Sequence, residues 1–149
     1  MKLDRPFRWK GNLSEMLPKP QRVAKTVHHP ALASSDVSAW YAALRGRDGV
    51  AARALEFLTL TAARSGEVRG MVWGEVDLNA GVWTVPATRM KARREHRVPL
   101  SVPANSLLEL MAQAPDAVPT DGGCPVFPAP RGGALSDMSL SAVMRRMQD

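Results

Sequence analysis

Within residues 58–85, LTLTAARSGEVRGMVWGEVDLNAGVWTV, the spacing of apolar residues changes from that of a helix to that of a β-strand. This change sets the predicted architecture. An apolar face at helical spacing leads into this stretch and predicts a buried helix. The face consists of Ala51, Ala54, Leu55, Leu58 and Ala62. Next, Ser65 as N-cap and Glu67 in the first turn predict a short second helix. From Met71 the apolar period is two, and Asn79-Ala80-Gly81 separates the runs 72–78 and 82–85, which predicts a β-hairpin.

The residues on either side extend this order to helices, a sheet and helices again. Upstream, Ser34-Ser35-Asp36 predicts the N-cap of a helix that ends at Gly46. Downstream, residues 97–100 predict a third strand, which Pro99 places at a sheet edge or a strand end. Further helices are predicted from Val102-Pro103 and from Ser136-Asp137. The apolar face of the last helix consists of Leu140, Val143, Met144 and Met147. We therefore expect a mainly α, α+β domain with a small three-stranded antiparallel sheet.

Length and composition indicate one globular domain with a basic surface. The 149 residues are 45% hydrophobic and 23% charged, which is typical of a folded protein. The net charge of +6 favours a polyanionic partner, most simply nucleic acid. The single Cys124 forms no internal disulfide and fits a reducing cytoplasm. The sequence contains no membrane-spanning run, no signal peptide, no metal-ligand cluster and no phosphate-cradling glycine loop, so no cofactor or metal is expected.

One candidate site is the junction between the two predicted helices at Arg64. A guanidinium beside the free N–H groups of a helix start can hold two phosphate oxygens at once. Glu67 is placed to brace that guanidinium from behind. The alternative for these two residues is a purely structural ion pair.

A second candidate site is the connection between the second and third strands, RMKARREHR at residues 89–97. This much positive charge at a hairpin tip can lie along a DNA backbone. The DNA-contacting residues expected there are Arg89, Arg93, Arg94, His96 and Arg97. Lys91 can instead give a proton to a leaving alkoxide at a phosphodiester. The alternative is a solvated basic loop.

Taken together, LTLTAARSGEV (58–68), VWGEVDL (72–78) and MKARREHRVPLS (90–101) resemble the catalytic domain of phage-type tyrosine recombinases, the integrases of prophages and genomic islands. The resemblance covers essentially the whole chain. It implies that residues 1–33 are a linker or arm that leads from a core-binding domain missing from this chain. It also implies that residues 34–149 are part of the catalytic domain.

The resemblance also implies a reaction and roles for individual residues. A tyrosine of the full-length protein attacks a DNA phosphodiester, and a 3′-phosphotyrosyl intermediate forms without a metal or nucleotide. Arg64 matches the first catalytic arginine, Glu67 the acidic residue that supports it, and Lys91 the general acid. The partners implied are double-stranded DNA at attachment sites and a homotetramer of the full-length protein in the bacterial cytoplasm. The isolated chain is expected to be a monomer or dimer.

Two features of the family are missing from the sequence. An H-x-x-R motif does not occur, and His28 and His29 precede the site. The only tyrosine, Tyr41, lies upstream of Arg64 on a predicted amphipathic helix, where packing is its expected role. The expectation is therefore half an active site, inactive alone, in an excised fragment or an interrupted prophage gene. A non-catalytic, excisionase-like DNA-binding regulator and an interaction module with incidental charge remain the alternatives.

Overall fold

The computed structural model describes residues 31–90, 92–113 and 122–148. The chain divides into two units, Met1–Ser34 and Ser35–Asp149, and the helices and strands from Val37 onward belong to the second unit. The arm predicted over residues 1–33 lies almost entirely outside the described residues, as does Lys91.

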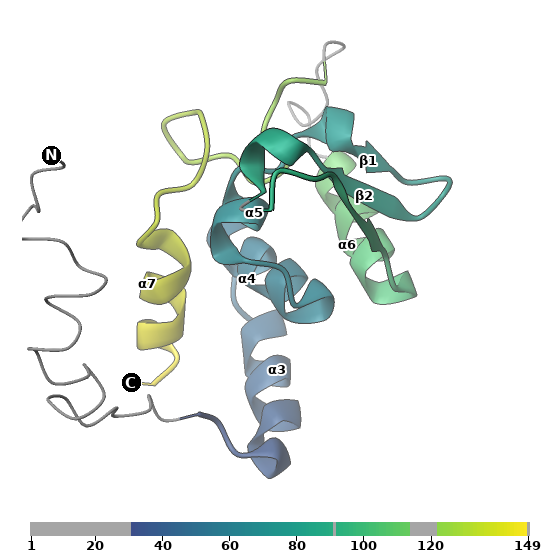
Figure 1. Cartoon of the computed structure of the whole chain (residues 1–149). Helices are drawn as coiled ribbons and strands as arrows, with labels where there is room; N and C mark the ends of the chain where they lie inside the picture. The colour runs from purple at the N-terminus through teal and green to yellow at the C-terminus, as the bar shows by residue number, and fades with distance from the viewer. Residues whose placement is uncertain (1–30, 91, 114–121, 149) are drawn as a thin grey trace, which may run out of the picture. The chain divides into compact units, whose positions relative to one another are not determined.

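The second unit has helices around a small sheet, in the order that the sequence predicts (Figure 1). The helices are α3 (Val37–Arg45), α4 (Val50–Thr61), α5 (Ser65–Arg69), α6 (Val102–Ala112) and α7 (Ser139–Arg146). The strands β1 (Val76–Asp77), β2 (Val82–Val85) and β3 (His96–Pro99) form an antiparallel sheet of order β1-β2-β3. Two short 3-10 helices accompany the sheet: η3 (Trp73–Glu75) precedes β1 and η4 (Ala87–Arg89) follows β2. The predicted fold class is confirmed.

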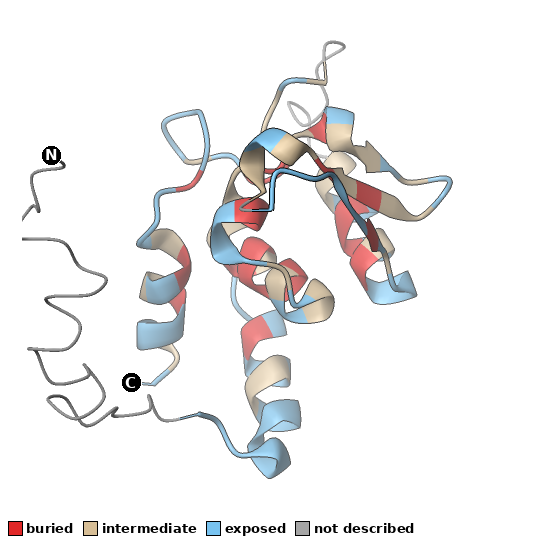
Figure 2. Cartoon of the chain, in the orientation of Figure 1, coloured by how far each residue is buried: buried red, intermediate tan, exposed pale blue. Residues whose placement is uncertain are grey.

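Helix α4 is the central element of the unit. It packs against α3, α5, α6 and α7, and Figure 1 shows it running between α6 and α7. Figure 2 shows that the buried sides of α6 and α7 face α4. Phe57 of α4 lies edge-on to Trp83 of β2, with ring centroids 5.6 Å apart, and 5.7 Å from Phe127. All three rings are fully buried, so this aromatic cluster joins helix, sheet and the segment before α7.

The prediction of the apolar face of α4 is partly wrong. Ala54 and Leu55 are buried as expected, but Ala62 is exposed and adopts a left-handed conformation after the helix has ended. The buried residues of α4 are Ala52, Ala54, Leu55, Glu56 and Phe57. Four neighbouring helices and the sheet cover α4 on several sides, so its buried surface is wider than a single stripe.

A buried carboxylate ties α3 to α4. Glu56 accepts a hydrogen bond from the Tyr41 hydroxyl at 3.3 Å and pairs with Arg53 at 2.7 Å. Arg53 also donates to backbone carbonyls at the end of α3, among them those of Arg45 at 3.0 Å and Arg47 at 2.7 Å. The buried charge is thus paired, and carbonyls that α3 leaves free are satisfied.

The first predicted strand is much shorter than residues 72–78. Only Val76–Asp77 pairs with β2, while Trp73–Glu75 forms η3. The backbone N–H groups of Trp73 and Gly74 donate to the carbonyls of Cys124 (3.1 Å) and Gly122 (2.8 Å). The backbone of η3 is therefore paired with a segment some fifty residues downstream and not with β2.

The predicted turn and third strand are confirmed. Gly81 has φ +63°, and the Asp77 carboxylate accepts a hydrogen bond from the Ala80 N–H at 2.8 Å. Strand β3 begins one residue earlier than predicted and lies at the sheet edge, where Pro99 pairs with Val82. Pro99 has no N–H to donate and suits this edge.

The two last helices follow the prediction with one shift. Helix α6 begins at Val102 with a proline in its first turn, as expected. Helix α7 begins at Ser139, three residues after the predicted start, because Ser136 and Ser139 close a preceding turn through their backbones (3.1 Å) and hydroxyls (2.9 Å). Leu140 and Val143 are buried, whereas Met144 is exposed. Within the described ranges, no helix is both long and apolar enough to cross a membrane.

Candidate functional site

The candidate site begins at the junction of α4 and α5. Ala62 ends α4 with φ +51°, and Arg64 follows in an extended conformation as the N-cap of α5. Ser65, the predicted cap, is instead the first residue of the helix. Glu67 takes over the capping: its Oε2 accepts the Arg64 backbone N–H at 3.0 Å, and its Oε1 accepts the Arg64 guanidinium at 2.7 Å. Two hydrogen bonds to one carboxylate thus hold both the backbone and the side chain of Arg64.

Burial differs sharply between the two partners. The Arg64 side chain is 70% exposed and the Glu67 side chain is 9% exposed. Only one arm of the guanidinium, Nη1, bonds to Glu67, and the rest of this exposed fork retains N–H donors for a further partner. The arrangement can hold an anion while the buried carboxylate keeps the guanidinium in place.

The electrostatics of Glu67 agree with this role. Burial by itself raises the pKa of this carboxyl group. The guanidinium and backbone hydrogen bonds from Arg64, with the positive charges of Arg64 and His96, outweigh burial and lower the pKa below its ordinary value. Glu67 is therefore a carboxylate at neutral pH and keeps Arg64 paired.

A hollow of about 390 Å³ is lined by residues from both predicted clusters. Arg64 and Glu67 line it from the junction of α4 and α5, and Met90, His96 and Val98 line it from the hairpin connection and β3. Met90 immediately precedes Lys91, which lies outside the described residues. The structure thus places Arg64, Glu67 and His96 around one hollow.

The basic connection itself is exposed. Arg93, Arg94, His96 and Arg97 are all exposed, and Arg93 turns the chain with φ +50° and donates its backbone N–H to the Met90 carbonyl at 2.9 Å. The three arginines present positive charge on the same connection that borders the hollow through Met90 and His96, and a surface that binds phosphates requires such charge.

Arg89 differs from the other basic residues of this connection. Its side chain is 26% exposed, and its guanidinium donates to the Glu67 backbone carbonyl at 3.0 Å and pairs with the Glu75 carboxylate. The sequence predicts Arg89 among the DNA-contacting residues and assigns no role to Glu75. The only sequence signal for Glu75 is an acidic residue between apolar positions of a predicted strand.

Tyr41, for which packing is the expected role, is half-buried and hydrogen-bonded to a neighbouring helix. Its hydroxyl donates to buried Glu56, and it is not among the residues that line the hollow at Arg64. Burial, followed by the charge and hydrogen bond of Glu56, raises the Tyr41 pKa above its ordinary value.

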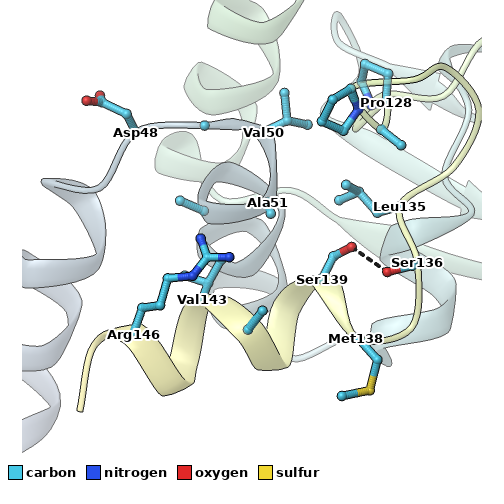
Figure 3. A pocket seen from close by; sticks show the side chains of 15 residues that line it. Asp48, Val50, Ala51, Pro128, Leu135, Ser136, Met138, Ser139, Val143 and Arg146 are labelled. Carbon is cyan, nitrogen blue, oxygen red and sulfur yellow. Dashed lines mark hydrogen bonds between the residues drawn. The ribbon is translucent and has the colours of Figure 1, made fainter. Parts of the chain in front are cut away.

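A second hollow, of about 740 Å³, lies between the start of α4, residues 128–136 and α7 (Figure 3). Small and apolar side chains such as Ala51, Leu135 and Val143 line most of it, with Arg146 at one side. Among the described residues, none of the site residues predicted from the sequence lines this hollow. In the described part of the chain, no group of three or more His, Cys, Asp or Glu side chains is arranged to hold a metal ion.

The fold is shared with solved structures of a recombinase and a transposon integrase. A structure titled XerA recombinase superposes with a TM-score of 0.62 at 17% identity, covering 91% of this chain and 47% of that one. The Tn1549 transposon integrase, solved in complex with circular intermediate DNA, gives 0.64 at 12% identity, covering 87% of this chain and 48% of that one. At these identities the likeness shows the fold alone.

Sequence comparison identifies the family. The model of the phage integrase family matches residues 31–149, and the chain belongs to this family. It is 33% identical over 122 residues to prophage integrase IntZ of Escherichia coli K12, covering 81% of this chain and 29% of IntZ. It is 39% identical over 105 residues to the integrase of enterobacteria phage P4, covering 60% of this chain and 24% of that protein. The chain therefore spans less than a third of the length of these relatives.

Proposed function

We propose that this chain supplies the Arg64-bearing half of the DNA strand-exchange site of a site-specific recombinase. The observation that carries the proposal is the hollow that exposed Arg64 and buried Glu67 share with Met90 and His96 of the basic hairpin connection. Membership of the phage integrase family and the DNA-bound state of the Tn1549 integrase support it. In this proposal residues 34–149 are part of the catalytic domain and residues 1–33 lead into it from a core-binding domain.

Each residue then has a definite task on double-stranded DNA. Arg64 holds non-bridging oxygens of the scissile phosphate, and Glu67 keeps Arg64 in place. A tyrosine oxygen bonds to the phosphorus, the bond to the 5′-oxygen breaks, and Lys91 gives that oxygen a proton. Arg93, Arg94, His96 and Arg97 lie along the flanking phosphates. The full-length protein acts as a homotetramer at attachment sites in the bacterial cytoplasm.

Trapping of the covalent intermediate tests this proposal. Tyr41 is hydrogen-bonded to Glu56 and does not line the hollow at Arg64. We therefore expect that this chain forms no phosphotyrosyl adduct with a suicide DNA substrate, as judged on a denaturing gel. A longer polypeptide that joins this chain to the remaining part of a phage integrase catalytic domain, with its tyrosine, should form the adduct. In that polypeptide Arg64→Ala should reduce adduct formation at least about 100-fold, as expected when a charged group that stabilises the transition state is removed.

The controls separate the candidate functions. Tyr41→Phe should leave adduct formation by the longer polypeptide unchanged, and an adduct that disappears with Tyr41→Phe would overturn the site assignment. The position of Tyr41 outside the hollow also keeps a second candidate open, a non-catalytic DNA-binding regulator. DNA binding by the longer polypeptide without any adduct would favour that regulator.

A further inference from the structure

We propose that Arg89 and Glu75 are positioning residues, which clamp the backbone of Glu67 to the sheet and thereby hold Arg64 in the orientation that receives its anion. This inference rests on the proposed function and names residues of that same site.

The clamp is a continuous chain of hydrogen bonds from the sheet to Arg64. The indole N–H of Trp83, in β2, donates to the Glu75 carboxylate at 3.2 Å. That carboxylate pairs with one arm of the Arg89 guanidinium, and the other arm donates to the Glu67 carbonyl at 3.0 Å. Glu67 in turn holds Arg64 through its side chain. The planar fork of arginine makes both bonds at once in a fixed geometry, which the single ammonium of lysine cannot reproduce.

Burial argues that this pair serves more than general stability. The Glu75 side chain is 12% exposed and the Arg89 side chain 26% exposed. Removing two charges from water costs free energy that their attraction only partly returns, so such a pair is weak evidence for stability by itself. What the pair adds is a fixed geometry, because Arg89 is also hydrogen-bonded to α5 and Glu75 to β2.

Gly70 provides independent evidence that this space is kept for Arg89. Gly70 ends α5 with φ −95° and ψ 8°, a conformation open to residues with a side chain. A Cβ atom added there would lie 2.7 Å from Nη1 of Arg89, much closer than van der Waals radii allow. The Arg89 guanidinium therefore occupies space that a side chain at position 70 would take, and an added Cβ, which would also lie 3.3 Å from the Gly66 carbonyl oxygen, would displace this guanidinium.

The clamp also explains how the hairpin and Arg64 keep their spacing. Arg89 is the last residue of η4, and Met90, the next residue, lines the hollow. Fixing Arg89 to the Glu67 carbonyl therefore fixes the point where the connection that carries Lys91 begins. One side chain, Arg89, thus links the backbone of Glu67 to the start of the connection that continues with Met90.

Two substitutions that keep the net charge test the clamp in the whole chain. Gly70→Ala pushes the Arg89 guanidinium away without changing any charge, and Arg89→Lys keeps the charge but removes the fork. The matched controls are Gly46→Ala and Arg53→Lys. Gly46 also ends a helix, with nearest atoms at an ordinary 3.5 Å from an added Cβ. Arg53 resembles Arg89 in pairing with a buried glutamate and donating to backbone carbonyls.

The first readout is the Glu67 pKa, measured by carbon NMR titration of its carboxyl group. Both clamp variants should raise this pKa toward the ordinary glutamate value, because Glu67 would hold Arg64 less firmly, and both controls should leave it unchanged. An unchanged Glu67 pKa in the clamp variants, or an equal rise in the controls, overturns the proposal.

The second readout is affinity for duplex DNA, which tests the link to function. The clamp variants should bind about 3- to 10-fold more weakly, the effect of loosening one charge-assisted hydrogen bond. Arg64→Ala serves as the reference for complete removal of the Arg64 guanidinium. If Arg64→Ala leaves DNA affinity unchanged, the proposed function fails, while the NMR titration still decides whether Arg89 and Glu75 position Glu67.

Discussion

At the scale of single residues, the site depends on an unequal pair in which the acid is buried and the base is exposed. Glu67 satisfies the N-cap of α5 and the Arg64 guanidinium at once. Because those bonds need an ionised carboxylate, the same pair that orients Arg64 also makes folding sensitive to acid.

We therefore expect a specific acid response from Glu67. Its folded-state pKa lies below the unfolded value of about 4.3, so its contribution to stability is present above that pH and disappears as the pH falls through the folded-state pKa. Glu67→Gln should destabilise the chain by about 1–2 kcal/mol near neutral pH, as a weakened helix cap does. The variant should also lose less stability than the wild type on further acidification.

Urea unfolding from neutral to acidic pH measures this response. Glu109→Gln is the control, because Glu109 is exposed and accepts its hydrogen bond from the Asn105 side chain on the same helix. If Glu67→Gln and wild type lose stability in parallel below about pH 4.3, Glu67 does not stabilise the fold as an ionised cap.

At the scale of elements, the β2–β3 connection separates two kinds of arginine. Arg89, at its start, faces inward and braces α5, whereas Arg93 and Arg94, at its tip, are exposed. Only the second kind is free to lie along a phosphate backbone.

The tip arginines should contribute to DNA binding through phosphates. Arg93→Ala with Arg94→Ala should weaken binding to all duplex sequences alike. It should also flatten the dependence of log affinity on log salt by about 0.9 for each phosphate that the protein no longer neutralises. Fluorescence anisotropy at several salt concentrations measures both quantities.

A double variant on α7 supplies the control with the same net charge. Arg145 and Arg146 are exposed there, and Arg146 borders the second hollow rather than the site. Arg145→Ala with Arg146→Ala should change the salt dependence less. Equal effects of the two double variants would mean that the hairpin arginines only add to the long-range attraction between the protein and DNA. An affinity for DNA that does not change with salt would favour the interaction module.

At the scale of the whole second unit, one core links the helices to the sheet through three aromatic rings. Phe127 reaches this cluster from the segment that precedes α7, next to Val126, whose N–H donates to the Met71 carbonyl at 2.9 Å. The same segment holds η3 out of the sheet. The position of Glu75 therefore depends on residues that follow it by about fifty positions.

Truncation of Phe127 should reveal this dependence. Phe127→Ala should lower the free energy of unfolding by about 3–5 kcal/mol, as removal of a buried aromatic side chain does. Leu110→Ala, at a residue that is 59% exposed, should change it by less than about 0.5 kcal/mol. Urea unfolding followed by circular dichroism measures both. A small effect of Phe127→Ala would mean that this segment is not part of the same cooperative unit.

The sequence alone determined the features that depend on local period and turn chemistry. These are the helices over 37–45, 50–61 and 102–112, the turn at Gly81, the edge strand at Pro99, and the proximity in sequence of Arg64 and Glu67. The resemblance to the phage integrases could also be recognised in the sequence, because each motif of that family is a contiguous run of residues. Only the tertiary structure decided that residues 73–75 leave the sheet and that Arg89 turns inward to Glu75 and the Glu67 carbonyl. Both outcomes depend on hydrogen bonds between residues 14 to 51 positions apart, as between Glu75 and Arg89 or Trp73 and Cys124, and no local period records such pairings.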